Sequence, residues 1–177
     1  MNVCVFCAAN NVDARYSEPA ARLAQLLGEQ SHTLIWGGDD SGLMKVMADG
    51  VSESGGRIVG ISVELLRHKA RQQADEMIFT SDIAERKALM IERADVLVLM
   101  VGGIGALSEA TDVLVLRKHK KHTKPLIVLN TAGFYRGLQQ QLEHMNSEGF
   151  LPLKLEEVIY FAETPGEVLE YMQKEQS

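Results

Sequence analysis

The sequence predicts an α/β protein in which a doubly wound parallel sheet carries helices on both faces. Short apolar segments alternate with amphipathic helical segments along the whole chain, and the connections between them are short. Because crossovers between parallel strands are right-handed, such a chain winds its helices onto both faces of the sheet. The chain has 177 residues, 46% hydrophobic and 24% charged, so residues 1–177 are expected to form a single Rossmann-like domain with a buried core.

The predicted strands are short runs rich in Val, Ile, Leu and Phe. Val96–Met100, for example, has five consecutive apolar residues, as expected for a strand that is covered on both faces. The predicted strands are Asn2–Cys7, His32–Trp36, Arg57–Ile61, Glu76–Phe79, Val96–Met100, Pro125–Leu129 and Val158–Phe161.

Capping residues mark where the predicted helices begin. Ser17 is expected to be an N-cap, with Pro19 in the first turn of its helix. The segments Asp82–Glu85 and Thr164–Glu167 both have the spacing of a capping box. The predicted helices are Ser17–Gln30, Leu43–Ser54, Asp82–Ala94, a helix that follows the Gly102–Gly105 turn and runs through Arg117, Tyr135–Glu148, and a C-terminal helix that starts at Thr164.

Composition and charge exclude several functional classes. The net charge is −6, and five of the 18 basic residues lie between positions 117 and 124, so the rest of the chain is strongly acidic. This balance argues against a nucleic-acid-binding protein. The chain has no apolar run of membrane-spanning length and no charged segment before its first apolar stretch, and it has two cysteines. We therefore expect no membrane partner and no signal peptide, and a cytoplasmic location.

Ligands of open parallel sheets bind beyond the carboxyl ends of the strands, where the strand order reverses. Two glycine-containing loops follow predicted strands, and glycine lets the backbone approach a ligand while a helix N-terminus favours an anion. The loops contain Gly37, Gly38 and Asp39, and Gly102, Gly103, Gly105 and Ala106. Two such loops in one sheet indicate a nucleotide or phosphate ligand, although tight turn geometry alone also explains each loop.

Established nucleotide-binding motifs fit these loops poorly. The Gly37–Gly42 segment has the glycine spacing of a P-loop, but Leu43 and Met44 stand where its Lys and Ser or Thr belong. The Gly103–Ser108 segment approximates a dinucleotide fingerprint but lacks the last glycine and follows the wrong strand.

Two charged features lie close to these loops in the sequence. Glu109 follows the Gly102–Gly105 loop by one helical turn, within reach of a ligand on that loop. Arg86 and Lys87 lie in the first turn of a predicted helix, where cations oppose the helix dipole. Such local conflicts mark functional positions. The alternative, that these are ordinary surface charges, stays open from spacing alone.

Metal-site patterns are not found in the sequence. Cys4 and Cys7 are three residues apart in a predicted strand and so point to opposite faces, which indicates buried thiols. His119 and His122 lie in a basic segment without a nearby carboxylate or cysteine. We therefore expect no metal ion. The longer segment Ser62–Asp75 is predicted to be a mobile loop over the site.

At this level of detail the chain resembles a known family. Glu85–Met90 resembles an ERKxxM segment, and Val101–Glu109 resembles a PGGxGTxxE loop. These are hallmarks of the LONELY GUY family of phosphoribohydrolases, some of whose members carry the label lysine decarboxylase. Supporting matches are collinear over roughly residues 3 to 160. Nothing in the chain suggests a pyridoxal phosphate site, so we discount the decarboxylase label.

The resemblance implies an enzyme that hydrolyses the N-glycosidic bond of a cytokinin-type purine nucleoside 5′-monophosphate, releasing the free base and ribose 5-phosphate. It implies no metal or organic cofactor, and a homodimer with the site near the subunit interface. Arg86 and Glu109 become the catalytic pair. A carboxylate near C1′ can stabilise an oxocarbenium-like sugar, and a guanidinium can neutralise phosphate or polarise the leaving base. The substrate-binding residues implied are Lys87, Met90, Asp112 and the two glycine loops.

Departures from the family pattern cluster where the phosphate would bind. The usual Pro is Val101, the usual Thr is Ala106 and a glycine of the first loop is Asp39. A carboxylate there repels a phosphate unless a cation such as Lys45 offsets it. These changes predict altered substrate choice, toward a ligand with a weaker or absent 5′-phosphate. The alternative is a non-catalytic nucleotide-binding or sensing paralogue, and a third hypothesis is an interaction role for the basic segment 118–124.

Overall fold

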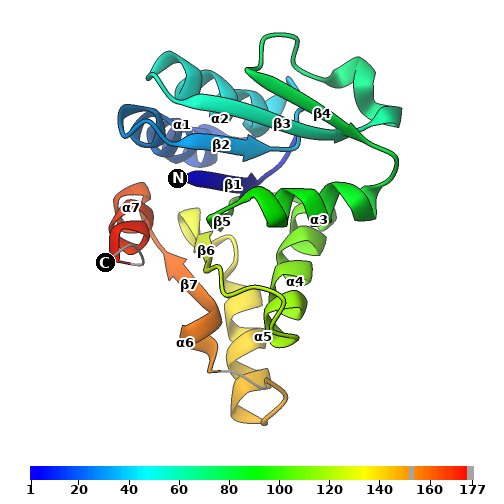
Figure 1. Cartoon of the computed structure of the whole chain (residues 1–177). Helices are drawn as coiled ribbons and strands as arrows, with labels where there is room; N and C mark the ends of the chain where they lie inside the picture. Colours follow the sequence, from blue (N-terminus) through cyan, green and yellow to red (C-terminus); the bar gives the residue numbers. More distant parts are fainter. Residues whose placement is uncertain (152–153, 175–177) are drawn as a thin grey trace.

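The computed structural model describes residues 1–151 and 154–174 and contains one seven-stranded parallel sheet. The strand order is β4-β3-β2-β1-β5-β6-β7, so the chain starts at the centre, moves outward to one edge and returns beside β1 to build the other half (Figure 1). The strand order therefore reverses between β1 and β5. The strands are β1 Asn2–Phe6, β2 Thr33–Trp36, β3 Arg57–Val63, β4 Glu76–Thr80, β5 Val96–Leu99, β6 Leu126–Leu129 and β7 Ile159–Ala162.

Helices cover both faces of the sheet, which confirms the predicted doubly wound architecture. Buried side chains of α1, α2 and α7 belong to one core cluster, and those of α3, α4 and α5 belong to the other (Figure 1). The helices are α1 Ala14–Glu29, α2 Gly42–Glu53, α3 Ile83–Arg93, α4 Ile104–Lys118, α5 Arg136–Ser147, α6 Leu155–Val158 and α7 Pro165–Lys174, with short 3-10 helices η1 Glu64–Lys69 and η2 Thr131–Gly133.

The central strands contribute side chains to both core clusters, one on each face of the sheet. In β1, Val3 and Val5 pack into one cluster while Cys4 and Phe6 pack into the other. Alternate residues of a strand point to opposite faces, so a strand that is buried on both sides must be apolar at every position. This explains why the central strands are continuous apolar runs in the sequence.

The first helix begins earlier than the sequence predicted. Asp13 is the N-cap of α1, because its carboxylate accepts a hydrogen bond from the Arg15 N–H at 3.0 Å. The expectation that Ser17 caps this helix is wrong, since the Ser17 N–H already donates to the Asp13 carbonyl inside the helix. An aspartate satisfies the free N–H groups of a first turn as well as a serine does.

The two predicted capping boxes are present in a modified form. Asp82 accepts a hydrogen bond from the Glu85 N–H at 2.8 Å, as a capping box requires. The Glu85 carboxylate, however, reaches back one residue further and accepts from the Ser81 N–H at 2.9 Å. At the start of α7, Glu167 likewise accepts from the Glu163 N–H at 2.8 Å. In both helices the reciprocal bond therefore ties down the residue before the cap.

Other elements were not predicted. The segment Ser62–Asp75 contains η1, and the last strand begins at Ile159 because the residues before it form α6. Single helical turns carry too few residues to show a hydrophobic period. None of the helices in the described part of the chain has the length and apolar character needed to cross a membrane.

Candidate active site

A cavity of about 500 Å³ opens at the carboxyl ends of the strands, where the strand order reverses. Loops after β1, β2, β3 and β5 form its walls, together with side chains of α3 and α4. The lining residues are Cys7, Ala8, Ala9, Asn10, Val12, Gly37, Asp39, Met44, Ser62, Leu66, Lys69, Arg86, Val101, Gly102, Gly103, Gly105, Ala106 and Glu109.

Arg86 and Glu109 meet at this cavity. The Arg86 Nη1 atom lies 2.7 Å from the Glu109 Oε1 atom, and Arg86 Nε donates to the Ile61 carbonyl at 2.9 Å. Glu109 is 6% exposed, and the Arg86 side chain is 15% exposed. The two residues, on α3 and α4, are distant in sequence, and the structure brings them together as a buried charge pair.

The unfavourable position of Arg86 in its helix now has a physical explanation. Cations in the first turn of a helix oppose its dipole. The Arg86 guanidinium instead bonds to Glu109 and to the carbonyl at the end of β3. These tertiary contacts outweigh a local preference that is worth about 0.3–1 kcal/mol.

Burial raises the pKa of Glu109 above its usual value. The charges of Arg86 and Lys87 lower this pKa, but they do not fully offset the burial, and Asp112 adds to the rise. A carboxylate with a raised pKa, fixed by a guanidinium at a cavity wall, is suited to exchange protons with a bound molecule. Burial also raises the pKa of the Cys7 thiol, which therefore stays protonated near neutral pH.

Glycine residues make space for the pair and for a ligand. A Cβ atom at Gly37 would lie 2.5 Å from the Arg86 Nη2 atom, so a side chain at this position would displace the guanidinium. Around Gly103 and Gly105 an added Cβ atom would meet nothing within 4 Å, because these residues face open space. Gly103 is the N-cap of α4 and offers no side chain to the N–H groups of the first turn. These groups are available to an anion in the cavity.

The charges near Asp39 differ from the sequence expectation. The Asp39 carboxylate lines the cavity and accepts a hydrogen bond from Ser41 Oγ at 2.6 Å. Lys45 is not its counter-charge, because Lys45 Nζ lies 3.0 Å from Asp49 and 3.8 Å from Asp40. Two cations line the cavity together with Asp39: Arg86, and Lys69 of η1, which lies in the segment that the sequence predicted to be a loop over the site.

Lys87 and Asp112 pair with each other beside the cavity. Lys87 Nζ lies 2.5 Å from Asp112 Oδ2 and donates to Ser108 Oγ at 3.2 Å. Neither residue is at the wall of the 500 Å³ cavity. Lys87 borders a more open hollow of about 750 Å³, which also touches Arg86 and Glu109. Lys87 directly follows Arg86, so its side chain points to a different side of α3, and Asp112 lies almost one turn further along α4 than Glu109.

Met90 and Gly38 also lie outside the cavity wall. Met90 is 1% exposed and packs in the core between α3 and the sheet, so the expectation that it lines the pocket is wrong. Met44 of α2 is part of the wall and also packs against the core. Gly38 accepts a hydrogen bond from the Arg71 N–H through its carbonyl and has a φ of +80°. Cys4 and Cys7 are free and buried in opposite core clusters, as predicted.

Together the fold and the site define a Rossmann-like α/β protein with a ligand cavity at its topological switch point and a buried carboxylate–guanidinium pair in the cavity wall. A family model described as possible lysine decarboxylase matches residues 44–172. The chain therefore belongs to this family, the LONELY GUY family that its motifs resemble.

Named relatives support the same family. The cytokinin riboside 5′-monophosphate phosphoribohydrolase of Mycobacterium tuberculosis is 31% identical over 160 residues, covering 89% of this chain and 86% of that protein. The enzyme of the same name, LOG5, from Arabidopsis thaliana is 34% identical over 152 residues, covering 84% of this chain and 67% of that protein. The molybdenum cofactor binding protein of Rippkaea orientalis shares the fold, with a TM-score of 0.78 at 22% identity, covering 99% and 97% of the two chains.

Proposed function

We propose that this protein hydrolyses the N-glycosidic bond of a purine nucleoside 5′-monophosphate of the cytokinin type, or of a related nucleoside. The observation that carries the proposal is the Arg86–Glu109 pair, joined at 2.7 Å in a glycine-lined cavity. The names of the relatives from Mycobacterium tuberculosis and Arabidopsis thaliana support this reaction. The cavity volume of about 500 Å³ is within the range of small-molecule sites.

In the proposed reaction, the bond between C1′ and the base nitrogen breaks and a water molecule adds to C1′. Positive charge develops on the sugar, and the ionised Glu109 carboxylate stabilises it and orients the attacking water. The water oxygen forms the new bond to C1′ and keeps one of its protons as the C1′ hydroxyl. Glu109 accepts the other proton and passes it to the base nitrogen, which leaves with the electron pair of the broken bond. Arg86 holds the Glu109 carboxylate in place and keeps a share of it ionised despite its burial.

The departures at the phosphate end lead to a proposal about the substrate. Ala106 offers no hydroxyl to a phosphate, and the Asp39 carboxylate faces the same cavity. A hydrogen bond to a charged group contributes about 1.5–3 kcal/mol, so each missing donor weakens phosphate binding. The N–H groups at the start of α4 and the Lys69 ammonium remain as anion-binding groups. We propose a reduced preference for the 5′-phosphate over the free 5′-hydroxyl.

Release of free base is the direct test of the proposed reaction. Purified protein is incubated with nucleoside monophosphates and the matching nucleosides, and the free base is quantified by chromatography. Glu109→Gln should abolish most of the release, while Glu92→Gln, an exposed carboxylate of α3, should leave it unchanged. No release from any substrate by the unaltered protein, or equal release by Glu109→Gln, would refute the proposal.

A non-catalytic binding role is the second candidate, and the changes at Ala106 and Asp39 favour it. A rise in Tm with AMP or ribose 5-phosphate, without release of base, would support this role, because a ligand that binds the folded state stabilises it. The double variant Ala106→Thr with Asp39→Gly separates the two candidates. Gain of AMP hydrolysis in this variant would show that Arg86 and Glu109 can carry out the reaction, and that Ala106 and Asp39 change which substrate the cavity accepts.

We also propose a homodimer with the site near its interface. Leu65, Ile83 and Ile104 are large apolar side chains that are 82%, 63% and 82% exposed. Leu65 and Ile83 border the 750 Å³ hollow beside Arg86 and Glu109, and exposed apolar groups of this size are typical of interaction surfaces. Light scattering should give twice the 19.5 kDa chain mass. A monomer at micromolar concentration, or a dimer that Ile104→Glu leaves intact, would contradict this arrangement.

A further inference from the structure

One wall of the cavity is built from a short segment with little packing of its own. Leu66 and Lys69 of η1 line the cavity, and all six residues of this 3-10 helix are exposed. A segment without a buried side chain has few contacts that fix its position. Apart from the Arg67 guanidinium, which lies 3.6 Å from the centre of the Phe79 ring of β4, the position of this wall depends on what holds its two ends.

The end that follows η1 is tied to the loop between β2 and α2. Asp39 and Ala70 form an isolated antiparallel bridge. The Asp40 N–H donates to the Lys69 carbonyl at 3.1 Å, and the Arg71 N–H donates to the Gly38 carbonyl at 2.9 Å. Two segments that are about thirty residues apart in sequence are thus joined directly behind the cavity wall.

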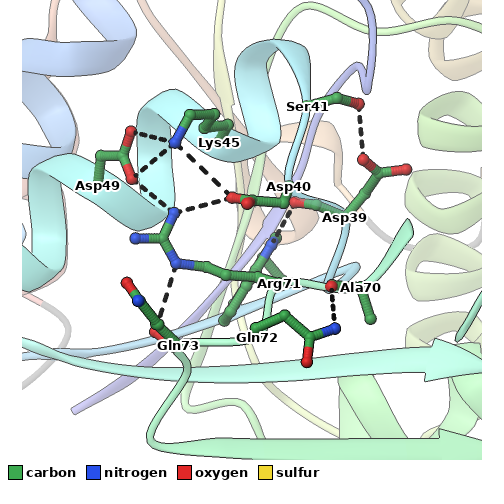
Figure 2. Close-up of polar contacts among 10 residues, drawn as sticks. Asp39, Asp40, Ser41, Lys45, Asp49, Ala70, Arg71, Gln72 and Gln73 are labelled. Carbon is green, nitrogen blue, oxygen red and sulfur yellow. Dashed lines mark hydrogen bonds and ion pairs between the residues drawn. The ribbon is translucent and has the colours of Figure 1, made fainter. Parts of the chain in front are cut away.

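The Arg71 side chain reinforces this junction from the side away from the cavity. Its Nη1 atom lies 3.0 Å from Asp40 Oδ1 and 2.5 Å from Asp49 Oδ1 (Figure 2). With an exposed fraction of 12%, Arg71 is the most buried side chain among these ion pairs, and Lys45 pairs with both carboxylates from the solvent side. Burial opposes the ionisation of Asp49, but hydrogen bonds from Arg71 and Lys45 outweigh it and hold the pKa of Asp49 below its usual value.

Asp39 and Asp40, which are consecutive residues, have different partners at this junction. Figure 2 shows the Asp40 carboxylate directed toward Arg71 and the Asp39 carboxylate directed toward Ser41. Asp39 lines the cavity, and its carbonyl accepts a hydrogen bond from Trp36 Nε1 at 3.3 Å. Because Asp39 and Asp40 are joined by one peptide bond, the contact of Arg71 with Asp40 also restricts the position of Asp39 at the cavity wall.

We propose that Arg71 is a positioning residue for the cavity: by joining the segment after η1 to Asp40 of the β2–α2 loop and to Asp49 of α2, it holds Lys69, Leu66 and Asp39 at the wall that faces the Arg86–Glu109 pair. Arg71 itself does not line the cavity. Its proposed effect on substrate binding rests on the proposed function, whereas its effect on the position of the wall does not.

Hydrogen–deuterium exchange of the unliganded protein tests the effect on the wall. In Arg71→Ala, the amides of residues 64–71 should exchange at least about tenfold faster, as expected when a hydrogen-bonded charge pair is lost. The central strands β1 and β5 should keep their protection. Asp49→Asn should shift exchange in the same direction. Arg71→Lys should give an intermediate effect, because lysine retains the charge that meets Asp40 and Asp49 but loses the Nε hydrogen bond to the Gln73 carbonyl.

A matched control distinguishes this role from a general effect of removing an arginine. Arg57 forms an ion pair with Glu76 at 3.3 Å across β3 and β4 and does not contact the cavity. Arg57→Ala should leave exchange of residues 64–71 unchanged. Unchanged exchange in both Arg71→Ala and Asp49→Asn would overturn the proposal. A rise of equal size in the central strands would also overturn it, because it would indicate global destabilisation.

Kinetics test the link to substrate. With whichever substrate gives the largest release of base, Arg71→Ala should raise KM about tenfold and change kcat less than about threefold, the pattern of lost binding without lost chemistry. An equal fall in kcat with KM unchanged would refute the positioning role. If the unaltered protein releases no base, the proposed function fails, and the exchange measurements still decide whether Arg71 holds the wall.

Discussion

Removal of the Arg86 guanidinium should make the stability of the protein depend strongly on pH. In Arg86→Ala the Glu109 carboxylate, 6% exposed, loses the cation that lies 2.7 Å from it. Breaking a buried ion pair by removing one partner costs about 3–5 kcal/mol when the remaining group stays charged. Because the Arg86 side chain is 15% exposed, we expect the lower end, about 3 kcal/mol at pH 8.

The sign of the pH dependence follows from the direction of the pKa shift. Burial already raises the pKa of Glu109 in the folded protein, and Arg86 lowers it in part. Without Arg86 the folded-state pKa rises further above the unfolded value. The protonated Glu109 then contributes stability that is fully present below the unfolded pKa and is lost as the pH rises through the folded pKa. The loss is at most about 1.4 kcal/mol per pH unit for one group.

Urea unfolding at several pH values between 5 and 8 measures this effect. The difference in unfolding free energy between Arg86→Ala and the unaltered protein should widen as the pH rises. The control compares the double variant Arg86→Ala with Glu109→Gln against Glu109→Gln alone. Glutamine cannot ionise in either protein, so the difference in unfolding free energy between them should stay constant over the same range. The reasoning is refuted if the single variant shows the same loss at pH 5 and pH 8, or if the double variant shows an equal slope.

Two further predictions concern the raised pKa of Glu109 and the backbone of the β2–α2 loop. If base release requires ionised Glu109, kcat/KM should fall as the pH decreases through a value above 4.5, the usual pKa of this group, because burial raises it. If kcat/KM instead falls only at pH values below 4.5, the group that must be ionised is not Glu109 with a raised pKa. Gly42→Ala should reduce the unfolding free energy by about 3 kcal/mol, because Gly42 has a φ of +54° and an added Cβ atom would collide with carbonyl oxygens of the loop after β1. Gly55 has a φ of +89° and open space around it, so Gly55→Ala should reduce the unfolding free energy by only about 1 kcal/mol. If chemical denaturation shows equal losses for the two variants, the predicted collision at Gly42 does not destabilise the protein.

The fold could be predicted from the sequence because its signals are local. Each central strand is apolar along its length, since both faces are buried, and α3 and α7 begin at capping residues that the sequence shows directly. The capping role of Asp82 needs no more than three neighbouring residues. The glycine loops and the position of Glu109 after one of them likewise pointed to the site, because parallel strands end at the same edge of the sheet.

The tertiary structure alone decided which charged groups meet. Lys45 and Asp49 are one helical turn apart on α2, a spacing that the sequence already contains, but the sequence does not show that the loop before α2 brings Asp40 rather than Asp39 to Lys45. The contact of Arg71 with Asp40 joins residues 31 positions apart. The sequence determined the elements, because backbone hydrogen bonding and hydrophobic periodicity act over a few residues. The ion pairs around the cavity depend on the rotation and depth at which helices pack on the sheet, and no local pattern encodes those.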